Sequence, residues 1–586
     1  METAKSLSFD PANHSAHRFL SDTYANTPRH EIARVSELLQ AQLLQPINVN
    51  PVQPHMAVAD LNIITNTGPS AIGFNEFAPL MERNKPQLVT SGIVGSNNTL
   101  GDEIVASALY GRGSISIGQF HYETIGFRRN NNQPDMANNN DLKHNIYNVF
   151  MQYAITPRLN IQAELNTRKT EHGDVLMQFD RDNYNQFQRF GINQDKARIG
   201  ARYAISSNQD VIVSAALTNR EKVLDNQLPK DSPFNVSSTD STKEISYQTE
   251  VQYLLRQEYL NITAGGGAYR VDTDRLIIEN GPQLSNPNRV TTTPIKDYRN
   301  DRDNAYIYSN INFPRSISTT LGLSYDWIHV GRKIKGYDST TFNPKFGFQW
   351  DITGNLRFRA AWFETVRSAL VASQTIEPTQ VAGFNQFFDD VAGTKSRRKG
   401  AGLDVRITNN LYSGFEISER KITIPSVIEG KVYKNDESDQ IEKLYRTYLY
   451  WLPHSNWTIK GELQNEKLAQ LTPQLTEDYP NRIDTLSASI GLKYFNPNGM
   501  LGGLTGTHVE QELGADQTPD SKFFLLDASI GYRFPNRRGI ISFDVRNFLD
   551  QKFRYWSSYL QNNDQLTAAP RFTPGRTFFL RLTLNF

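Results

Sequence analysis

The sequence predicts an all-β chain that forms a closed, membrane-spanning antiparallel β-barrel of about 22 strands, preceded by a short α-helical segment. Three observations predict this fold. From Pro86 to the C-terminus, apolar and polar residues alternate with period two on segments of about ten residues. Short turns alternate with long polar loops along the same region, and the last strand alternates up to a terminal phenylalanine.

The composition indicates that, if the chain crosses a membrane, it does so with strands and not with helices. Only 38% of the 586 residues are apolar, and the mean hydropathy is -0.53. The sequence has no run of about 18 apolar residues, which a transmembrane helix requires. A barrel wall needs only every second residue to be apolar, so these values fit a barrel. A soluble β-rich protein fits composition equally well.

Charge and cysteine content exclude several classes of function. The chain has 62 Lys and Arg residues against 61 Asp and Glu residues, a net charge of +1, so nucleic acid is not an expected partner. Cysteine is absent, which excludes disulfides, thiolate catalysis and cysteine metal sites.

Residues 1–45 are expected to be helical. The stretch AKSLSFDPANHSAHRFLSDTY resembles the end of one tetratricopeptide helix and the start of the next. One repeat cannot bury its own face, so we expect a remnant of a longer array that recruits a periplasmic protein. A simple helical cap is the alternative. The N-terminus lacks the apolar region of a signal peptide, which indicates that the chain begins inside a longer protein.

Residues 46–84 are expected to link the helices to the barrel. Pro46, Pro51 and Pro54 each lack a backbone donor and disfavour helix. The stretch GFNEFAPLMERN, within 56–84, carries Phe residues that a purely solvated linker does not need. This segment is therefore also a candidate for filling the barrel lumen.

Residues 85–586 are expected to form the barrel. In Thr485–Tyr494 one face carries Leu, Ala, Ile, Leu and Tyr, and the other carries Thr, Ser, Ser, Gly and Lys. A soluble sandwich would alternate in the same way, so connection lengths decide. Short turns are expected at 111–113, 156–158, 353–355, 496–499 and 535–539, and long loops near 128–141, 170–193, 222–242, 272–302 and 370–397.

Such an asymmetry between turns and loops is typical of a barrel whose two rims face the periplasm and the exterior. An even number of strands returns both termini to the short-turn rim. We therefore expect the N-terminal helices in the periplasm, with outer-membrane lipid around the barrel.

The last strand alternates between two faces. Its inward set includes Arg581, Thr583 and Asn585. Its expected outward set is Phe578, Leu580, Leu582, Leu584 and the terminal Phe586. This pattern resembles the signal by which the assembly machinery recognises barrels of the bacterial outer membrane.

Two stretches resemble a family. VRNFLDQKFRY, Val545 to Tyr555, followed later by PGRTFFLRLTLNF, resembles the last two strands of TonB-dependent receptors. AWFETVRSALVASQTIEPTQ, Ala361 to Gln380, resembles a receptor strand and the loop after it. The resemblance implies an outer-membrane transport pore or receptor. Residues 1–84 hold neither the family's N-terminal plug nor its TonB-contacting box.

No catalytic or metal-ligand motif is present, so neither an enzyme nor a cofactor is expected. The ten histidines include no H-E-x-x-H pattern. The candidate functional residues are the charges expected to face the lumen: Arg198, Arg202, Glu250, Arg357, Arg359, Asp527, Arg533, Asp544, Arg546 and Arg581. The simpler interpretation is that these charges neutralise one another and contact lumen water.

Three functions remain open. The first is a receptor-like transport pore that is coupled to a periplasmic partner through its helices. The second is a polysaccharide-export porin, a class with about 16 strands. The third is a non-transporting scaffold whose loops bind ligands. A lumen of about 22 strands needs filling, and we expect residues 56–84 and loop 370–397 to fill it.

Overall fold

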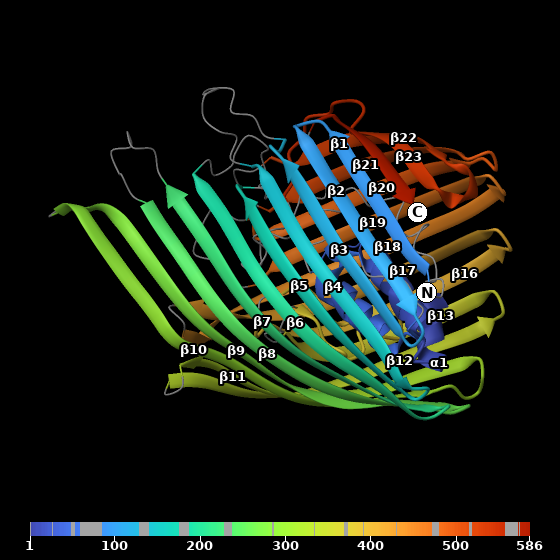
Figure 1. The fold of residues 1–586 in the computed structure, drawn as a ribbon, viewed down its shortest axis with the longest axis horizontal. Coiled ribbons are helices and arrows are strands. Elements are labelled where there is room, and N and C mark those ends of the chain that lie inside the picture. The colour runs from blue at the N-terminus through green and yellow to red at the C-terminus, as the bar shows by residue number, and fades with distance from the viewer. Residues whose placement is uncertain are drawn as a thin grey trace.

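A computed structural model of the chain describes residues 2–25, 27, 29–47, 53–58, 85–127, 140–174, 187–227, 237–283, 286–332, 335–367, 373–390, 392–428, 431–471, 480–514, 519–556, 572–573 and 575–586. Within these residues, 22 strands form one antiparallel sheet that closes on itself (Figure 1). The predicted fold class and the predicted strand number are confirmed.

The barrel strands are β1 (Lys85–Gly95), β2 (Thr99–Tyr110), β3 (Gly113–Thr124), β4 (Leu142–Thr156), β5 (Leu159–His172), β6 (Gln188–Ser206), β7 (Gln209–Gln227), β8 (Ser237–Arg256), β9 (Leu260–Gln283), β10 (Asn286–Ile311), β11 (Ile317–Arg332), β12 (Lys335–Thr353), β13 (Leu356–Val366), β16 (Lys395–Thr408), β17 (Leu411–Ile428), β18 (Lys431–His454), β19 (Trp457–Gln470), β20 (Arg482–Phe495), β21 (Met500–Leu513), β22 (Ser521–Arg533), β23 (Gly539–Arg546) and β24 (Thr577–Asn585). A small separate hairpin consists of β14 (Gln380–Val381) and β15 (Phe384–Asn385).

Helices precede the barrel. They are α1 (Glu2–Phe9), α2 (His14–Tyr24), α3 (Glu31–Leu44) and the 3-10 turn η1 (Pro54–Ala57), and a further 3-10 turn, η3 (Pro535–Arg537), joins β22 to β23. Asn13 caps α2, because its side-chain oxygen accepts a hydrogen bond from the backbone N–H of Ala16. None of the helices in the described ranges has the length and apolar character needed to cross a membrane.

Closure follows from the pairing of the first strand with the last. β1 pairs with β24 in a register that sets Val89 opposite Asn585 and Gly95 opposite Phe579. Every other barrel strand pairs with its neighbours in chain order, except that β13 pairs directly with β16. A closed sheet leaves no unpaired edge, which hydrocarbon would not tolerate.

Alternation along each strand separates the two faces of the wall. In β2, Glu103 and Val105 are buried toward the interior, whereas Ile104 between them is 40% exposed on the outside. The same period holds in β6, where Arg198 is buried and Ile199 is 64% exposed. The outer face is therefore apolar and the lumen face largely polar, as a lipid-facing wall requires.

The two rims differ in their connections. In the described part of the chain, ten turns of two to five residues lie on one rim, including all five predicted short turns. Both chain termini of the barrel lie on this rim, because β1 starts there and β24 ends there. The other connections, including 125–141, 173–187 and 367–394, lie on the opposite rim.

The bounds of two predicted loops are wrong. Most of 222–242 and nearly all of 272–302 belong to strands, so β8, β9 and β10 extend far beyond the wall on the loop side (Figure 1). The polar sequence of these strands is explained by charge pairs between neighbouring strands, such as Arg299 with Asp272 at 2.6 Å and Arg270 with Asp301 at 3.0 Å. Opposite charges on facing strands stabilise a sheet that has water on both sides.

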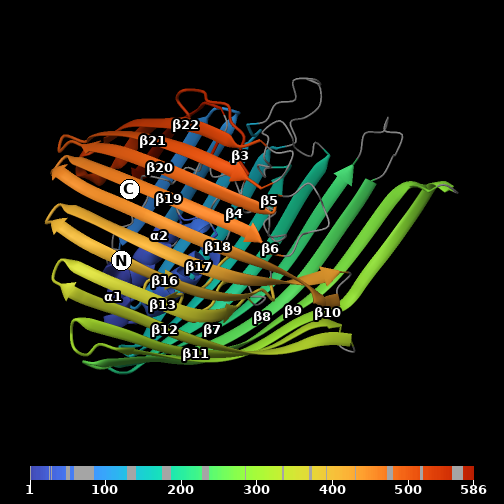
Figure 2. The ribbon, with the colours of Figure 1, turned by 180° about the vertical axis from the view of Figure 1, so that it is seen from behind.

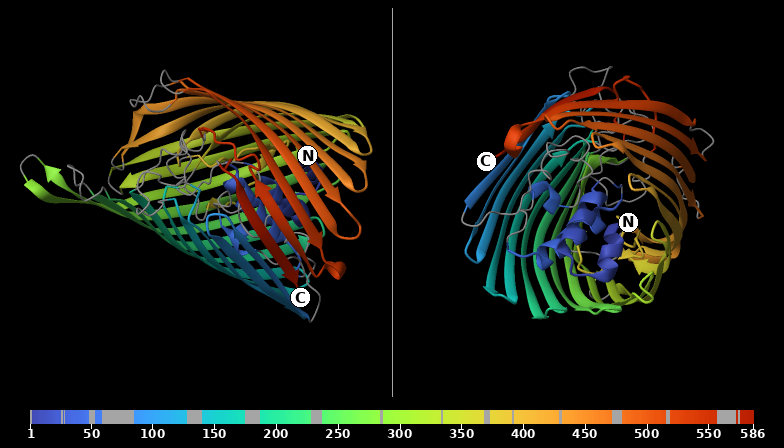
Figure 3. Two further views of the ribbon diagram at one scale, coloured as in Figure 1. Left: turned by 90° about the horizontal axis from the view of Figure 1, so that it is seen from above. Right: turned by 90° about the vertical axis from the view of Figure 1, so that its right-hand side faces the viewer.

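The predicted position of the N-terminal helices is also wrong. α1, α2 and α3 lie inside the barrel (Figure 3, right) rather than in the periplasm. The apolar core sits where these helices meet the inner wall: Leu39, Leu43 and Leu44 of α3 pack with Ile212 and Leu254. Figure 2 shows β16 to β22, the part of the wall across the lumen from these contacts.

Candidate functional site

The lumen contains the N-terminal segment, here defined as residues 2–47 and 53–58. Its helix α3 is buried along its whole length, including the polar Arg34, Glu37 and Gln40. A helix in the periplasm would leave such side chains in water. Inside the barrel they meet a wall whose inward residues are polar, which is the physical reason for the corrected position.

Polar contacts hold the segment to the wall. Gln162 donates a hydrogen bond to the carbonyl oxygen of Gln42 at 3.0 Å, and Gln152 donates to that of Gln45 at 3.0 Å. At the other end, the carbonyl oxygen of Ser8 accepts hydrogen bonds from two asparagine side chains of β9 and the β10–β11 turn. These contacts satisfy backbone groups that the ends of the helices leave open.

Glycines in the wall make room for the segment. A Cβ atom at Gly200 would lie 2.6 Å from a methyl carbon of Leu43, and one at Gly118 would lie 2.5 Å from the ring of Pro54. Real Cβ contacts are much longer, so only glycine permits this approach. The inner wall is thus shaped for the segment at two separate places.

The described part of the loop between β13 and β16, residues 373–390 and 392–394, also lies in the lumen, as predicted for 370–397. Its Thr375 hydroxyl donates to Glu250 at 2.5 Å, and the backbone N–H of Thr375 donates to the hydroxyl oxygen of Ser36 at 3.1 Å. Thr379 donates to Glu37. The loop therefore contacts both the wall and α3. Residues 59–84, the other predicted filling, lie outside the described residues.

This loop caps α3 across the chain. Asp389 accepts hydrogen bonds from the backbone N–H groups of Glu31 at 3.0 Å and Ile32 at 2.9 Å. Burial and the nearby Glu31 carboxylate raise the pKa of Asp389 to about 6. A cap of this kind contributes about 1 kcal/mol. The loop and α3 thus stabilise each other as one lumen unit.

Asp390 joins the same unit to the wall. It accepts from Arg420 at 2.6 Å and from Arg29 at 3.2 Å, and Arg29 also contacts Glu442 at 2.5 Å. Burial alone would raise the pKa of Asp390, but the two guanidinium groups outweigh it and lower that pKa to about 2. Asp390 is therefore held by charged protein groups in the lumen and not by solvent.

Inside the segment, the buried side chain of His17 links two helices. His17 lies between the Glu37 carboxylate, 2.5 Å from Nδ1, and the carbonyl oxygen of Pro11, 3.0 Å from Nε2. Burial alone would lower the pKa of His17, but these two acceptors outweigh it and raise that pKa. The contact ties α2 to α3, which keeps the helices together as they fill the lumen.

Four of the predicted lumen charges contact the lumen unit, among them Arg359, whose guanidinium lies 4.5 Å from the ring centroid of Phe384 in the loop. Arg198 donates to Gln42 at 2.8 Å and to Glu164 at 2.9 Å, and Arg202 donates to the carbonyl oxygen of Leu44 at 2.6 Å. Glu250 accepts from the loop, as described above. These side chains lie in the lumen as predicted, but they act as anchors for other parts of the chain.

The other predicted charges, and Arg359 in addition to its contact with the loop, have partners on the inner wall. Asp544 pairs with Arg581 at 3.0 Å, and Asp527 accepts from the backbone N–H of Asn547 at 2.8 Å. Arg533 and Arg546 are half-buried near the ends of β22 and β23. Arg357 pairs with Asp351 at 2.6 Å, and Arg359 pairs with Glu416 at 2.5 Å.

An open space of about 1330 Å³ remains in the lumen. It lies between the N-terminal segment and the inner wall formed by β13 and β16 to β20. Arg357 and Arg359 border it, together with Phe19 of α2 and Tyr448 of β18. No group of three or more potential metal ligands occurs in the described residues. The lumen therefore offers a space bordered by polar and charged side chains beside the segment.

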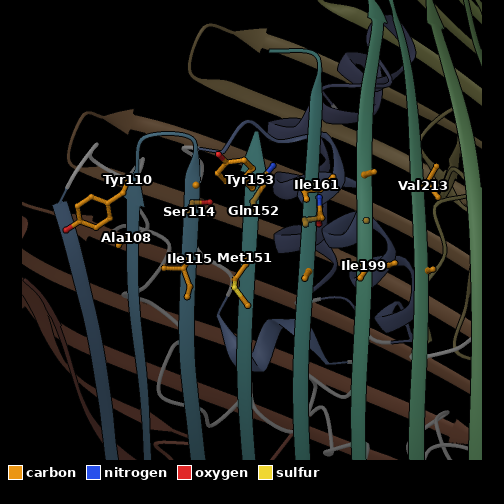
Figure 4. A pocket seen from close by; sticks show the side chains of 16 residues that line it. Ala108, Tyr110, Ser114, Ile115, Met151, Gln152, Tyr153, Ile161, Ile199 and Val213 are labelled. Carbon is orange, nitrogen blue, oxygen red and sulfur yellow. The ribbon is translucent and has the colours of Figure 1, made fainter. Parts of the chain in front are cut away.

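A second hollow, of about 740 Å³, lies on the outside of the barrel. Figure 4 shows its lining on neighbouring strands, with the helices behind the wall. Tyr110 is 56% exposed, Met151 is 43% exposed and Ile199 is 64% exposed on this face. Apolar side chains on the outer face contact lipid, so this hollow is not a site for a transported ligand.

The last strand presents its predicted outer face. Phe578, Leu580 and Leu582 are exposed on the outside, Leu584 is half-buried and Phe586 is exposed at the end of the chain. Their role as an assembly signal stays a prediction.

Comparisons with known proteins identify the fold. Residues 109–411 match the family model described as TonB dependent receptor-like, beta-barrel. No curated protein matches the sequence. Among solved structures, the copper transporter OprC is similar with a TM-score of 0.65 and 13% identity, covering 87% of this chain and 81% of that one.

Two further structures are similar. The ferric citrate transporter FecA has a TM-score of 0.60 and 13% identity, covering 86% of this chain and 78% of that one. The ferric-catecholate import receptor Fiu from E. coli K12 has a TM-score of 0.60 and 12% identity, covering 86% and 82%. At such identities these likenesses show the fold alone.

Proposed function

Because the chain belongs to the TonB-dependent receptor-like β-barrel family and lies in the bacterial outer membrane, we propose that it transports a ligand through its lumen. In this proposal the lumen unit, formed by the N-terminal segment and loop 373–394, closes the lumen at rest. Transport then requires the unit to shift. The observation that carries the proposal is the seating of this unit on wall glycines and wall charges.

The strand number favours this function over the polysaccharide-export porin, which has about 16 strands. The fold is of transporter and receptor type and is not that of an enzyme. Two proteins of similar fold are named as transporters of copper and of ferric citrate. A metal ion or a small metal complex is therefore the first ligand to test with this chain.

A periplasmic partner is part of the proposal. α1 lies near the short-turn rim, where Lys5 pairs with Asp351 at 2.5 Å, close to the β12–β13 turn. Phe9 is 39% exposed at the end of this helix. A partner that binds α1 at the rim could draw the segment aside, which would serve the coupling role expected of the tetratricopeptide-like helices.

Deleting residues 2–58 tests the closing role of the segment. We expect single-channel conductance in planar bilayers to rise severalfold, since the helices and η1 fill a large part of the lumen. Cells that carry the variant should also become sensitive to large antibiotics. Unchanged conductance in a variant that still assembles and shows heat-modifiable gel migration would contradict the proposal.

A further inference from the structure

The hollow on the outside of the barrel, lined by residues of β2 to β7 and here named the outer hollow, lies near the short-turn rim. Its lining includes Tyr110 and Gly113, the residues on either side of the β2–β3 turn. The hollow crosses five strand spacings of about 4.8 Å, which is about 24 Å along the wall. The outer face of a closed barrel is convex, so a hollow of about 740 Å³ needs a local cause.

Small residues at outward positions make the outer hollow. Ile199 lies between Ala163 and Ala215 in the register of the sheet, so one large side chain stands beside two small ones. Lipid-facing positions of a barrel ordinarily carry large apolar side chains, and each small residue leaves a side chain's depth of space. The outward positions of the lining that carry alanine or glycine are Ala108, Gly113, Ala163, Ala201 and Ala215.

Behind the outer hollow, the inner face of the same strands holds α3. Gln152 and Gln162 donate to carbonyl oxygens of α3 and of its C-terminal cap, and Gly200 makes room for Leu43. These inward residues alternate with the outward residues that line the hollow. Substitutions at the outward positions therefore change the hollow without replacing a side chain that contacts the lumen unit.

Two tyrosines lie at the end of the outer hollow that is nearer the turns. Figure 4 shows Tyr110 and Tyr153 there, with Met151 deeper in the wall. A tyrosine at the edge of the apolar band of a barrel places its ring against acyl chains and its hydroxyl group among lipid headgroups. The outer hollow thus begins at the headgroups of the periplasmic leaflet and continues among the acyl chains.

The turns beside the outer hollow carry positive charge. Arg112 lies in the β2–β3 turn and Arg158 in the β4–β5 turn, about two strand spacings, or about 10 Å, away. The Arg112 guanidinium donates to the carbonyl oxygen of Ile155 at 3.3 Å, which places it at the end of β4, two residues beyond Tyr153. Both arginines are exposed, and within the described residues neither pairs with a carboxylate. Two uncompensated charges therefore lie at the level of the headgroups.

We infer that the outer hollow binds an anionic phospholipid of the periplasmic leaflet, with an acyl chain against the small residues and the phosphate group beside Arg112 and Arg158. A guanidinium group matches a phosphate group with paired N–H donors. This charge complementarity favours a lipid over an apolar segment of another membrane protein, which presents no phosphate group. The binding goes beyond the proposed transport, because it uses only the outer face of the wall.

Lipid that stays on the purified chain tests the apolar part of the site. After extraction in mild detergent, the intact chain should retain phosphatidylglycerol in native mass spectrometry. The variant A163F/A201F fills the hollow and should lower the lipid-bound fraction severalfold. The matched control is A106F/A197F, which changes two outward alanines of β2 and β6 that do not line the hollow. Heat-modifiable gel migration shows that each variant is assembled.

Competition between two headgroups tests the basic part of the site. In micelles with equal amounts of phosphatidylglycerol and phosphatidylcholine, the intact chain should bind phosphatidylglycerol severalfold more often. The variant R112E/R158E should lose this preference, because carboxylates would then lie beside the phosphate group. The matched control R537E/R538E should keep it, since it changes two exposed arginines of the same rim in the turn between β22 and β23.

Three results would overturn the inference. They are an intact chain that retains no phospholipid, equal retention by A163F/A201F and A106F/A197F, and an unchanged headgroup preference in R112E/R158E. Binding of another membrane protein at these positions in place of lipid would also overturn it. Failure of the proposed transport would appear differently, as unchanged conductance after deletion of residues 2–58.

Discussion

Gly200 is a wall residue that α3 approaches closely, through the side chain of Leu43. Replacing Gly200 with leucine should displace Leu43, because a Cβ atom at position 200 would lie only 2.6 Å from a methyl carbon of Leu43. Overpacking of this kind costs about 1–3 kcal/mol. We expect faster proteolysis of the N-terminal segment and a higher conductance.

The matched control is Gly191→Leu on the same strand, where an added Cβ meets nothing within 4 Å. Equal protease sensitivity in the two variants would show that α3 is not seated on Gly200.

Asp389 should make docking of the loop depend on pH. Its pKa in the folded protein is raised to about 6, so the folded state favours the protonated form. Its contribution is therefore fully present below about pH 4 and is lost as pH rises through about 6, with a total of up to about 3 kcal/mol. Asp390, with a pKa lowered to about 2, opposes this trend only below about pH 4.

Protease protection of the loop should thus be stronger at pH 5 than at pH 8. The variant Asp389→Asn keeps an oxygen acceptor for the α3 backbone and should lose this pH dependence. A variant with the same pH profile as the intact protein would assign the dependence to another group.

At the residue scale, the lumen charges show how far alternation predicts a site. Period two places Arg198 on the inner face correctly, because its neighbours Ile199 and Ala197 read as the outer face. Its partner Gln42 lies 156 positions away in a helix, and no local pattern reports such a contact. The sequence therefore predicted the inward position of Arg198 but not its hydrogen-bond partner.

At the scale of elements, the barrel strands were predicted well because each one has to solve the same local problem of lipid outside and water inside. β9 and β10 were cut short because their outer halves stand in water on both faces, where alternation of polarity is lost. α3 was predicted in the wrong compartment because an amphipathic helix has the same pattern of polar and apolar residues in the periplasm and in a barrel lumen.

β24 carries a prediction at this scale. Replacing Phe586 with aspartate should lower the amount of barrel in the outer membrane severalfold while synthesis continues, because the exposed end of this strand would lose its terminal aromatic group. Fractionation followed by blotting measures the effect, and Phe586→Tyr is the conservative control. Equal membrane levels for Phe586→Asp and the intact chain would mean that the terminal aromatic is not read during assembly.

At the scale of the whole molecule, the closed wall and the lumen unit are complementary. The wall supplies glycines, amides and arginines at inward positions, and the unit supplies leucines, carbonyl oxygens and carboxylates that meet them. Each fully buried leucine of α3 contributes roughly 1.5–3 kcal/mol relative to exposure. The lumen is therefore the favourable place for these helices.

Cross-linking in intact cells tests this placement most directly. In the cysteine-free chain, the pair Leu43→Cys and Gly200→Cys sets two thiols within reach of a disulfide, whereas Leu43→Cys with Gly191→Cys sets the second thiol on the outer face. We predict that mild oxidation links the first pair in nearly every assembled barrel and does not link the second. Absence of the link between positions 43 and 200 in assembled barrels would contradict a lumen closed by its own N-terminal helices.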